Sequence, residues 1–217
     1  MNFEQENLYH VYNQGNSKQN IFFSRNNYLF FLEKIKKHLL PHSDILAWCL
    51  MPNHFHLMIY VHTLEIEING SEKDSCSTTL SRATTMSKTI SRATNDSRQS
   101  LNKSMGVLLS SYTRAINLQE NRSGSLFKQH TKAECLTGIQ AITPTFLNTP
   151  LGTQINVRIP EREYPQTCFN YIHDNPVKAK LVSRKEDWEF SSYPDYCGAR
   201  NGKLINKDKA REFGLFV

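Results

Sequence analysis

Two histidines, His54 and His56, stand one residue apart in the stretch HFHLMIYV. From Phe55 onward apolar residues occupy every second position, which is typical of a half-buried strand, so both imidazoles are expected on one strand face. Two imidazoles in this arrangement can bind one metal ion, and additional oxygen ligands adapt such a site to harder ions. The pattern also fits two ordinary, half-exposed histidines of a sheet, and the spacing alone leaves both interpretations open.

The rest of the chain predicts the elements that position this strand. Hydrophobic periodicity and boundary residues predict strands at 8–14, 44–50, 54–61 and 125–135 and helices at 26–40, 101–118 and 165–175. The nearly all-apolar strand at 44–50 is expected to be central in its sheet. The last helix is expected to end at Asn175, because proline disfavours helical geometry in the residue before it. This order predicts an α+β fold, an antiparallel sheet with helices on one face.

Two stretches interrupt this pattern. Between Ser71 and Ser104, 15 of 34 residues are Ser or Thr, which leaves too few large apolar side chains to build a core. We interpret approximately 65–104 as a flexible insertion. Residues 138–163 are rich in Thr and Pro with little periodicity, and we interpret them as a second insertion. The expected organisation is one domain over residues 1–217 with these two insertions.

Composition limits the class of protein. The net charge of +6 and the sequence pI of about 9.0 are compatible with a polyanionic partner, and equally with a basic protein that has none. Five scattered cysteines form no C-x-x-C pair, which argues against a disulfide framework or a cysteine zinc site. No leader-like start and no membrane-length apolar run occur. The sequence therefore predicts a soluble, cytoplasmic protein with no membrane partner.

Basic residues gather in the second half of the chain. Between residues 101 and 140 five are basic and two are acidic. The candidates for contacts with nucleic-acid phosphates are Arg114, Arg122, Lys128, Lys132 and, further along, Lys178.

Five segments occur in an order that resembles a known family: YHVYNQG, AWCLMPNHFHLMIYV, SYTRAINLQENRSGSLFKQH, FNYIHDNPVKAKLV and DWEFSSY. The chain resembles the REP-associated tyrosine transposases, relatives of the single-tyrosine HUH transposases, in which two histidines flank a bulky hydrophobic residue. The resemblance covers roughly 8–62, 101–135 and 165–196 and skips both insertions. It implies the ferredoxin/RRM-like HUH fold.

The resemblance also implies a role for each candidate residue. The family motif Y-I-x-x-N-P-V matches at Tyr171, the nucleophile, and at Asn175, the third metal ligand beside His54 and His56. Transposase relatives often have Gln at the Asn175 position, whereas Asn fits the REP-associated branch. The implied activity is cleavage and rejoining of single-stranded, hairpin-forming DNA through a covalent 5′-phosphotyrosine. The implied cofactor is Mg²⁺ or Mn²⁺, which suit an Asn carbonyl oxygen.

Other interpretations stay open on the residues alone. Tyr171 also fits a core tyrosine of an amphipathic helix, and Asn175 fits a helix-terminal residue before proline. A domesticated, non-catalytic nucleic-acid-binding protein on the same fold is the main alternative, and metal-dependent cleavage would discriminate it. A hydrolytic metalloenzyme would need a carboxylate near the histidines. Replication-initiation and relaxase roles share the same chemistry. The sequence leaves open whether the active site forms within one chain or is completed across a homodimer.

Overall fold

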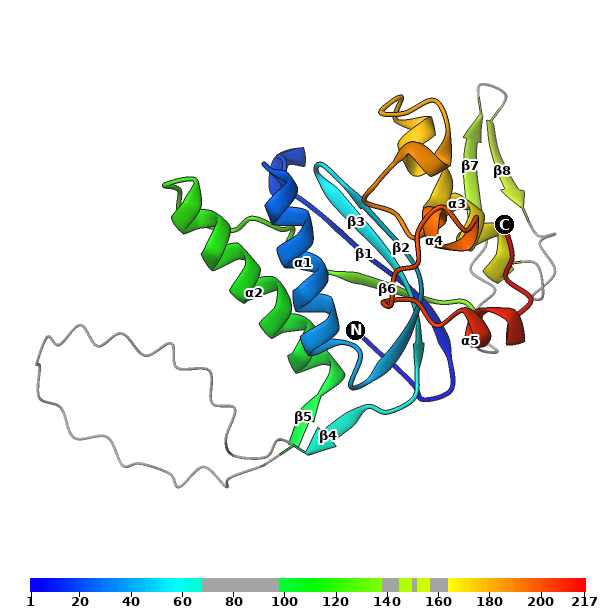
Figure 1. Cartoon of the computed structure of the whole chain (residues 1–217), viewed down its shortest axis with the longest axis horizontal. Coiled ribbons are helices and arrows are strands. Elements are labelled where there is room, and N and C mark those ends of the chain that lie inside the picture. Colours follow the sequence, from blue (N-terminus) through cyan, green and yellow to red (C-terminus); the bar gives the residue numbers. More distant parts are fainter. Residues whose placement is uncertain (68–97, 138–144, 150–151, 157–163) are drawn as a thin grey trace, which may run out of the picture.

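The computed structural model describes residues 1–67, 98–137, 145–149, 152–156 and 164–217 (Figure 1). At its centre is a four-stranded antiparallel sheet of order β2-β3-β1-β6. Its strands are β1 (Leu8–Gln14), β2 (Ser43–Met51), β3 (His54–Val61) and β6 (Lys132–Cys135). With α1 (Arg25–His38) and α2 (Leu101–Gln119), the chain order of the central elements is β1, α1, β2, β3, α2, β6. The predicted α+β fold with an antiparallel sheet is confirmed.

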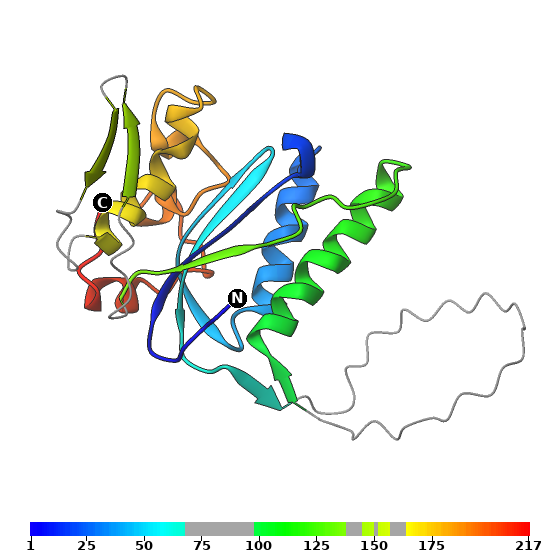
Figure 2. The same ribbon diagram turned by 180° about the vertical axis from the view of Figure 1, so that it is seen from behind.

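Helices α1 and α2 lie side by side on one face of the sheet (Figures 1 and 2). The apolar face predicted for β3 points toward them, since Phe55 packs in one core with Phe31 of α1 and Tyr112 of α2. All three side chains are fully buried. Burying each side chain of this size stabilises the fold by about 1.5–3 kcal/mol. The hydroxyl of Tyr112 donates to the carbonyl of Ile21 at 2.7 Å, so this tyrosine is a satisfied core residue.

The opposite face of the sheet is covered by α3 (Tyr164–Lys178) (Figure 1). The expectation that all helices lie on one face is therefore wrong. The physical reason for this difference is that the strands carry a second set of apolar side chains on their other face. This set includes Cys49, Met51 and Met58, and it must also be shielded from water. Phe169 and Ile172 of α3 pack against it and are fully buried.

We expect Phe169→Ala to lower the free energy of unfolding by about 3–5 kcal/mol, because it leaves a cavity under the helix that covers this face. Urea denaturation followed by circular dichroism measures the change. Phe23→Ala removes the same ring from a position that is 42% exposed, and its loss should stay below about 1 kcal/mol. Equal losses in the two variants would contradict the packing of α3 described above.

Strand β2 is an edge strand of the sheet rather than the central strand that its apolar sequence predicts. It is nonetheless buried, because residues from the C-terminal part of the chain bond to its free edge. Leu50 donates its backbone N–H to the carbonyl of Phe190 at 2.8 Å, and Trp48 accepts from the N–H of Ser192 at 2.9 Å. An edge covered in this way can be as apolar as a central strand, since it presents no unpaired backbone to water.

Helix α3 continues past Asn175 to Lys178, beyond the predicted end. The side chain of Pro176 is buried, so packing outweighs the local preference against a helix before proline. The backbone then leaves the helix at Lys180, whose φ of 57° is left-handed, while the N–H of Leu181 bonds back to the carbonyl of Pro176 at 2.9 Å. The extension keeps Asn175 inside the last turns of the helix, one turn after Tyr171.

Both expected insertions contain regular structure at their described residues. Strand β4 (Glu65–Glu67) pairs with β5 (Arg98–Ser100), so the ends of the stretch 65–104 form a two-stranded sheet that leads into α2. The predicted flexibility concerns mainly residues 68–97, which lie outside the described residues. In the stretch 138–163, β7 (Thr145–Thr149) pairs with β8 (Gly152–Asn156). The remaining short elements are the 3-10 helices η1 (Asn16–Lys18) and η2 (Lys185–Asp187) and the helices α4 (Tyr193–Tyr196) and α5 (Lys207–Glu212).

Replacement of residues 71–94 by a short Gly-Ser linker is expected to change the free energy of unfolding by less than about 1 kcal/mol. Glu67 and Arg98 already face each other in the β4–β5 pair, and the entropic cost of closing a loop varies slowly with its length. Thermal and urea melts of the two proteins give the comparison. A loss of several kcal/mol in the shortened protein would assign this segment to the core.

Within the described ranges, no helix has the length and apolar character needed to cross a membrane.

Candidate active site

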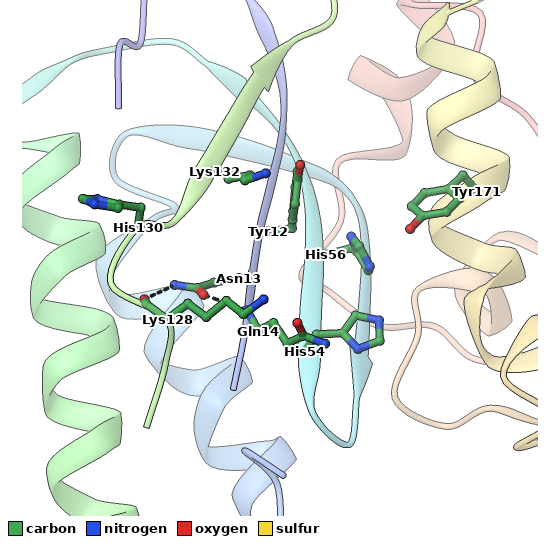
Figure 3. A pocket seen from close by; sticks show the side chains of 9 residues that line it. All are labelled: Tyr12, Asn13, Gln14, His54, His56, Lys128, His130, Lys132 and Tyr171. Carbon is green, nitrogen blue, oxygen red and sulfur yellow. Dashed lines mark hydrogen bonds between the residues drawn. The ribbon is translucent and has the colours of Figure 1, made fainter. Parts of the chain in front are cut away.

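A pocket with a volume of about 280 Å³ opens between β1, β3, the segment that leads into β6, and α3 (Figure 3). It is lined by Tyr12, Asn13, Gln14, His54, His56, Lys128, His130, Lys132 and Tyr171. The fold thus brings both histidines of the HFH stretch to the tyrosine of the last long helix, more than a hundred residues further along the chain. Two of the predicted basic residues reach the same pocket.

The two histidines share one face of β3, as the alternation predicts. Their ring centroids are 5.0 Å apart, with the planes at 86°. Burial lowers the pKa of His54, although hydrogen bonding with Asn175 opposes the shift. The pKa of His56 is held well below its usual value by burial and by the neighbouring rings of His10 and His54. Both imidazoles are therefore neutral at pH 7, which is the form that binds metal ions.

The orientation of His54 identifies its free nitrogen. Its Nδ1 lies 2.6 Å from the side-chain oxygen of Asn53, which can only accept a hydrogen bond. Nδ1 of His54 therefore carries the proton in the neutral ring, and Nε2 keeps its lone pair. This is the arrangement found in metal-binding histidines, whose second nitrogen donates to a nearby oxygen.

Tyr171 faces the histidines from α3 (Figure 3). Its ring centroid lies 5.4 Å from that of His56, and the residue keeps 42% of its surface exposed. Helix α3 positions it, because Phe169 and Ile172 anchor the helix on the sheet and leave Tyr171 beside the pocket. Burial raises the pKa of Tyr171, and hydrogen bonding with Asn175 lowers it. The phenol is neutral at pH 7 and must lose its proton during any attack on a substrate.

Asn175 lies one turn after Tyr171 on α3, and its side-chain N–H donates to the carbonyl of Tyr171 at 2.8 Å. It does not line the pocket, yet its side chain lies close enough to the His54 ring and the Tyr171 phenol to influence the pKa of each. With its N–H group engaged on the helix, the side-chain oxygen is the atom left to act as a ligand. The structure therefore brings together all four residues predicted for catalysis and metal binding.

The donor set fits a divalent cation. Across the described parts of the chain, no group of three His, Cys, Asp or Glu residues is arranged to hold a metal, so a site here depends on two imidazoles and an amide oxygen. Nε2 of His56 is buried and has no hydrogen-bond partner among the described residues. Leaving such an atom unpaired costs about 1–3 kcal/mol, which a bound cation would offset. Mg²⁺ or Mn²⁺ would find two nitrogen ligands and one oxygen ligand here.

His173 and Asp174, the titratable neighbours of Tyr171 in sequence, are engaged elsewhere. Nε2 of His173 is 2.8 Å from the hydroxyl of Ser192, and the residue is buried. The carboxylate of Asp174 pairs with Lys185 at 2.5 Å and Lys178 at 3.7 Å. Neither group is placed to take a proton from Tyr171.

The basic residues predicted for phosphate contacts divide into two groups. Lys128 and Lys132 line the pocket, and the amine of Lys178 lies 5.4 Å from the centroid of the Tyr171 ring. Arg114 lies on α2, which covers the other face of the sheet, and Arg122 follows that helix and donates to the side chain of Gln19 at 2.6 Å. The structure places neither arginine at the pocket.

Sequence reasoning missed His10 and Tyr12 of β1. Strand alternation places both on one face, and the antiparallel register sets Tyr12 opposite His56. Nε2 of His10 lies 2.9 Å from Nδ1 of His56. Burial lowers the pKa of His10 to about 4, against the opposing effect of the Glu134 carboxylate. The alternation was visible in the sequence, but the pairing of β1 with β3 was not, and that pairing decides the contact.

Comparison with protein-family models gives no match, and comparison with curated proteins gives none either. Among solved structures, the chain is similar to a REP-associated tyrosine transposase bound to a REP hairpin. The TM-score is 0.52 at 15% sequence identity, and the match covers 96% of this chain and 87% of the other. At this identity the similarity shows a shared fold. The fold of the chain is therefore similar to that of this solved transposase.

Proposed function

We propose that this protein is a metal-dependent tyrosine transposase, which cleaves and rejoins single-stranded, hairpin-forming DNA through a covalent 5′-phosphotyrosine. The observation that carries the proposal is the position of Tyr171, 5.4 Å from the ring of His56 and 42% exposed. Tyr112 gives the contrast within the same chain, because it is fully buried and bonded to a core carbonyl. A half-exposed phenol beside two neutral imidazoles is suited to nucleophilic attack.

The fold supports the same proposal. The order β1, α1, β2, β3, α2, β6 corresponds to the βαββαβ arrangement of ferredoxin-like folds, and we assign the chain to their HUH variant. The solved structure with the similar fold is that of a REP-associated tyrosine transposase bound to a REP hairpin. By that analogy we propose a hairpin-forming DNA repeat as the substrate.

The proposed step exchanges one phosphoester for another. The oxygen of Tyr171 bonds to phosphorus, the bond from phosphorus to the 3′-oxygen breaks, the phenolic proton passes to water, and the 3′-oxygen takes up a proton. Because the phosphoester is conserved, rejoining needs no ATP. Mg²⁺ or Mn²⁺ held by His54, His56 and Asn175 would offset negative charge that develops on the phosphate. In this scheme α3 keeps the nucleophile and the amide ligand at a fixed spacing of one helical turn.

Metal-dependent strand cleavage tests the proposal. The protein is incubated with hairpin-containing single strands labelled at either end, with Mn²⁺ or with a chelator, and the products are separated on a denaturing gel. We expect cleavage with Mn²⁺ only, with a free 3′-OH on one product and protein attached to the 5′ end of the other. Binding without cleavage across a broad pool of hairpins would favour the domesticated, non-catalytic alternative.

Lys128→Ala/Lys132→Ala is expected to weaken binding of single-stranded DNA and to flatten its dependence on salt. Each phosphate group that the double variant no longer neutralises should lower the slope of log K against log salt by about 0.7. Fluorescence anisotropy at several salt concentrations measures this slope. The matched variant Lys36→Ala/Lys103→Ala removes the same charge from α1 and α2, on the other face of the sheet. Identical slopes for the two double variants would contradict a DNA path over the pocket.

A further inference from the structure

His10 is a buried histidine with a direct contact to the proposed metal site. It lies on β1 beside β3, with Nε2 2.9 Å from Nδ1 of His56 and the two rings stacked at 5.1 Å between centroids. Only 6% of His10 and 5% of His56 are exposed. In such a dry environment a broken hydrogen bond is not readily replaced by water.

This hydrogen bond has two arrangements with opposite consequences. Both rings are neutral because burial disfavours their charged form, so a single proton lies between the two facing nitrogens. If His10 donates this proton, the neutral ring of His56 carries its own proton on Nε2. That nitrogen then has no lone pair for a metal. If His56 donates from Nδ1, the lone pair of its Nε2 is free. Nε2 is the buried atom of His56 for which the described residues provide no partner.

We infer that His10 is a positioning residue, which accepts a hydrogen bond from Nδ1–H of His56 and so fixes the tautomer whose Nε2 can bind a divalent cation. This inference rests on the proposed function, since it assigns the residue that prepares the metal ligand. The second nitrogen of a metal-binding histidine is usually bonded to a carboxylate, a carbonyl or water, and removal of that partner typically lowers metal affinity about 10–100-fold. Here another imidazole takes that place.

The neighbours of His10 hold its ring in place. Its ring stacks on Tyr12 at 4.8 Å, and the hydroxyl of Tyr12 donates to Glu134 at 2.6 Å. Glu134 is also the residue opposite His10 in the β1–β6 pair, and its carboxylate acts to raise the pKa of His10. When Nε2 of His10 accepts, the proton of its own neutral ring is on Nδ1. Stacking on Tyr12 and the contact with His56 hold the ring in place.

The tautomer of His56 is measurable in the metal-free protein. Histidine rings labelled with ¹⁵N give different nitrogen shifts for the Nδ1–H and Nε2–H forms, and a His56→Asn spectrum assigns the signals among the eight histidines. We expect His56 to be an Nδ1–H tautomer in the wild-type protein and to lose that preference in His10→Phe. An Nε2–H tautomer in the wild-type protein overturns the inference without bearing on whether Tyr171 is the nucleophile.

Metal affinity gives the second readout. We expect the Kd for Mn²⁺, from calorimetric titration, to rise about 10–100-fold in His10→Phe. His10→Gln, whose side-chain oxygen can still accept from Nδ1–H, should recover most of the affinity. His62→Phe makes the same change at an exposed histidine outside the pocket and should bind as the wild-type protein does.

The combined outcomes separate the two proposals. Thermal melts first establish that each variant is folded. Equal Kd values in His10→Phe and wild-type protein overturn the positioning role. A wild-type protein that has the Nδ1–H tautomer of His56 but does not bind Mn²⁺ overturns the metal site. The role assigned to His10 then fails as well, although the hydrogen bond between His10 and His56 is still established.

Discussion

Tyr171→Phe should abolish covalent capture of DNA while leaving DNA affinity within about twofold of wild type. The substitution removes one oxygen from a residue that is 42% exposed, so it creates no cavity and leaves the pocket surface nearly unchanged. Removing the nucleophile of an enzyme that acts through a covalent intermediate typically lowers the rate by on the order of 10⁴-fold or more. Capture is measured as protein-linked DNA on a denaturing gel, and affinity by anisotropy.

Tyr12→Phe is the matched control, because it also removes a hydroxyl from a tyrosine of the same pocket. Phe keeps the ring that stacks on His10, and the lost hydroxyl donates only to Glu134 among the described residues, so capture should stay intact. Capture that persists in Tyr171→Phe and disappears in Tyr12→Phe would reverse the assignment of the nucleophile. Parallel decreases in both would indicate damage to the pocket rather than to the chemistry.

His56→Ala has the second large expected effect, the loss of metal-dependent cleavage. Because it removes a proposed ligand, it should weaken Mn²⁺ binding by more than the roughly 10–100-fold typical of an outer partner. His56 is buried, so His54→Ala at the more exposed ligand gives a second test that disturbs packing less. Calorimetric titration with Mn²⁺ and the cleavage assay give the two readouts.

His130→Ala serves as the control for metal binding, since His130 lines the same pocket from the segment before β6 but is exposed. Its Kd for Mn²⁺ should equal that of the wild-type protein. Cleavage that persists in a chelator, or that is unchanged in both His54→Ala and His56→Ala, would refute a metal site on β3.

Local pattern was sufficient to predict most of the elements. Strand β1 occupies residues 8–14 as predicted, and the apolar face of β3 packs on α1 and α2 because a strand's period of two fixes which side chains share a face. The extension of α3 through Pro176 could not be read locally, since burial of that proline decides it. The edge position of β2 was hidden for a related reason, because distant residues around Phe190 cover its free edge.

The four site residues were predicted largely through the family resemblance, and the structure brings them together. His10 was missed because periodicity within one strand carries no information on which strand lies beside it. Arg114 was selected by charge alone, whereas its distance from the pocket follows from the face of the sheet that α2 covers. Cross-strand register and helix placement are properties of the packed chain, and these decide which polar groups meet.

Mass mapping of the adduct formed on hairpin-containing single-stranded DNA with Mn²⁺ decides whether Tyr171 is the nucleophile of a metal-dependent reaction. We expect one modified peptide, with a 5′-phosphonucleotide on the oxygen of Tyr171, and none when a chelator is present. An adduct on another residue, or an adduct on Tyr171 that forms equally well without metal, would contradict it.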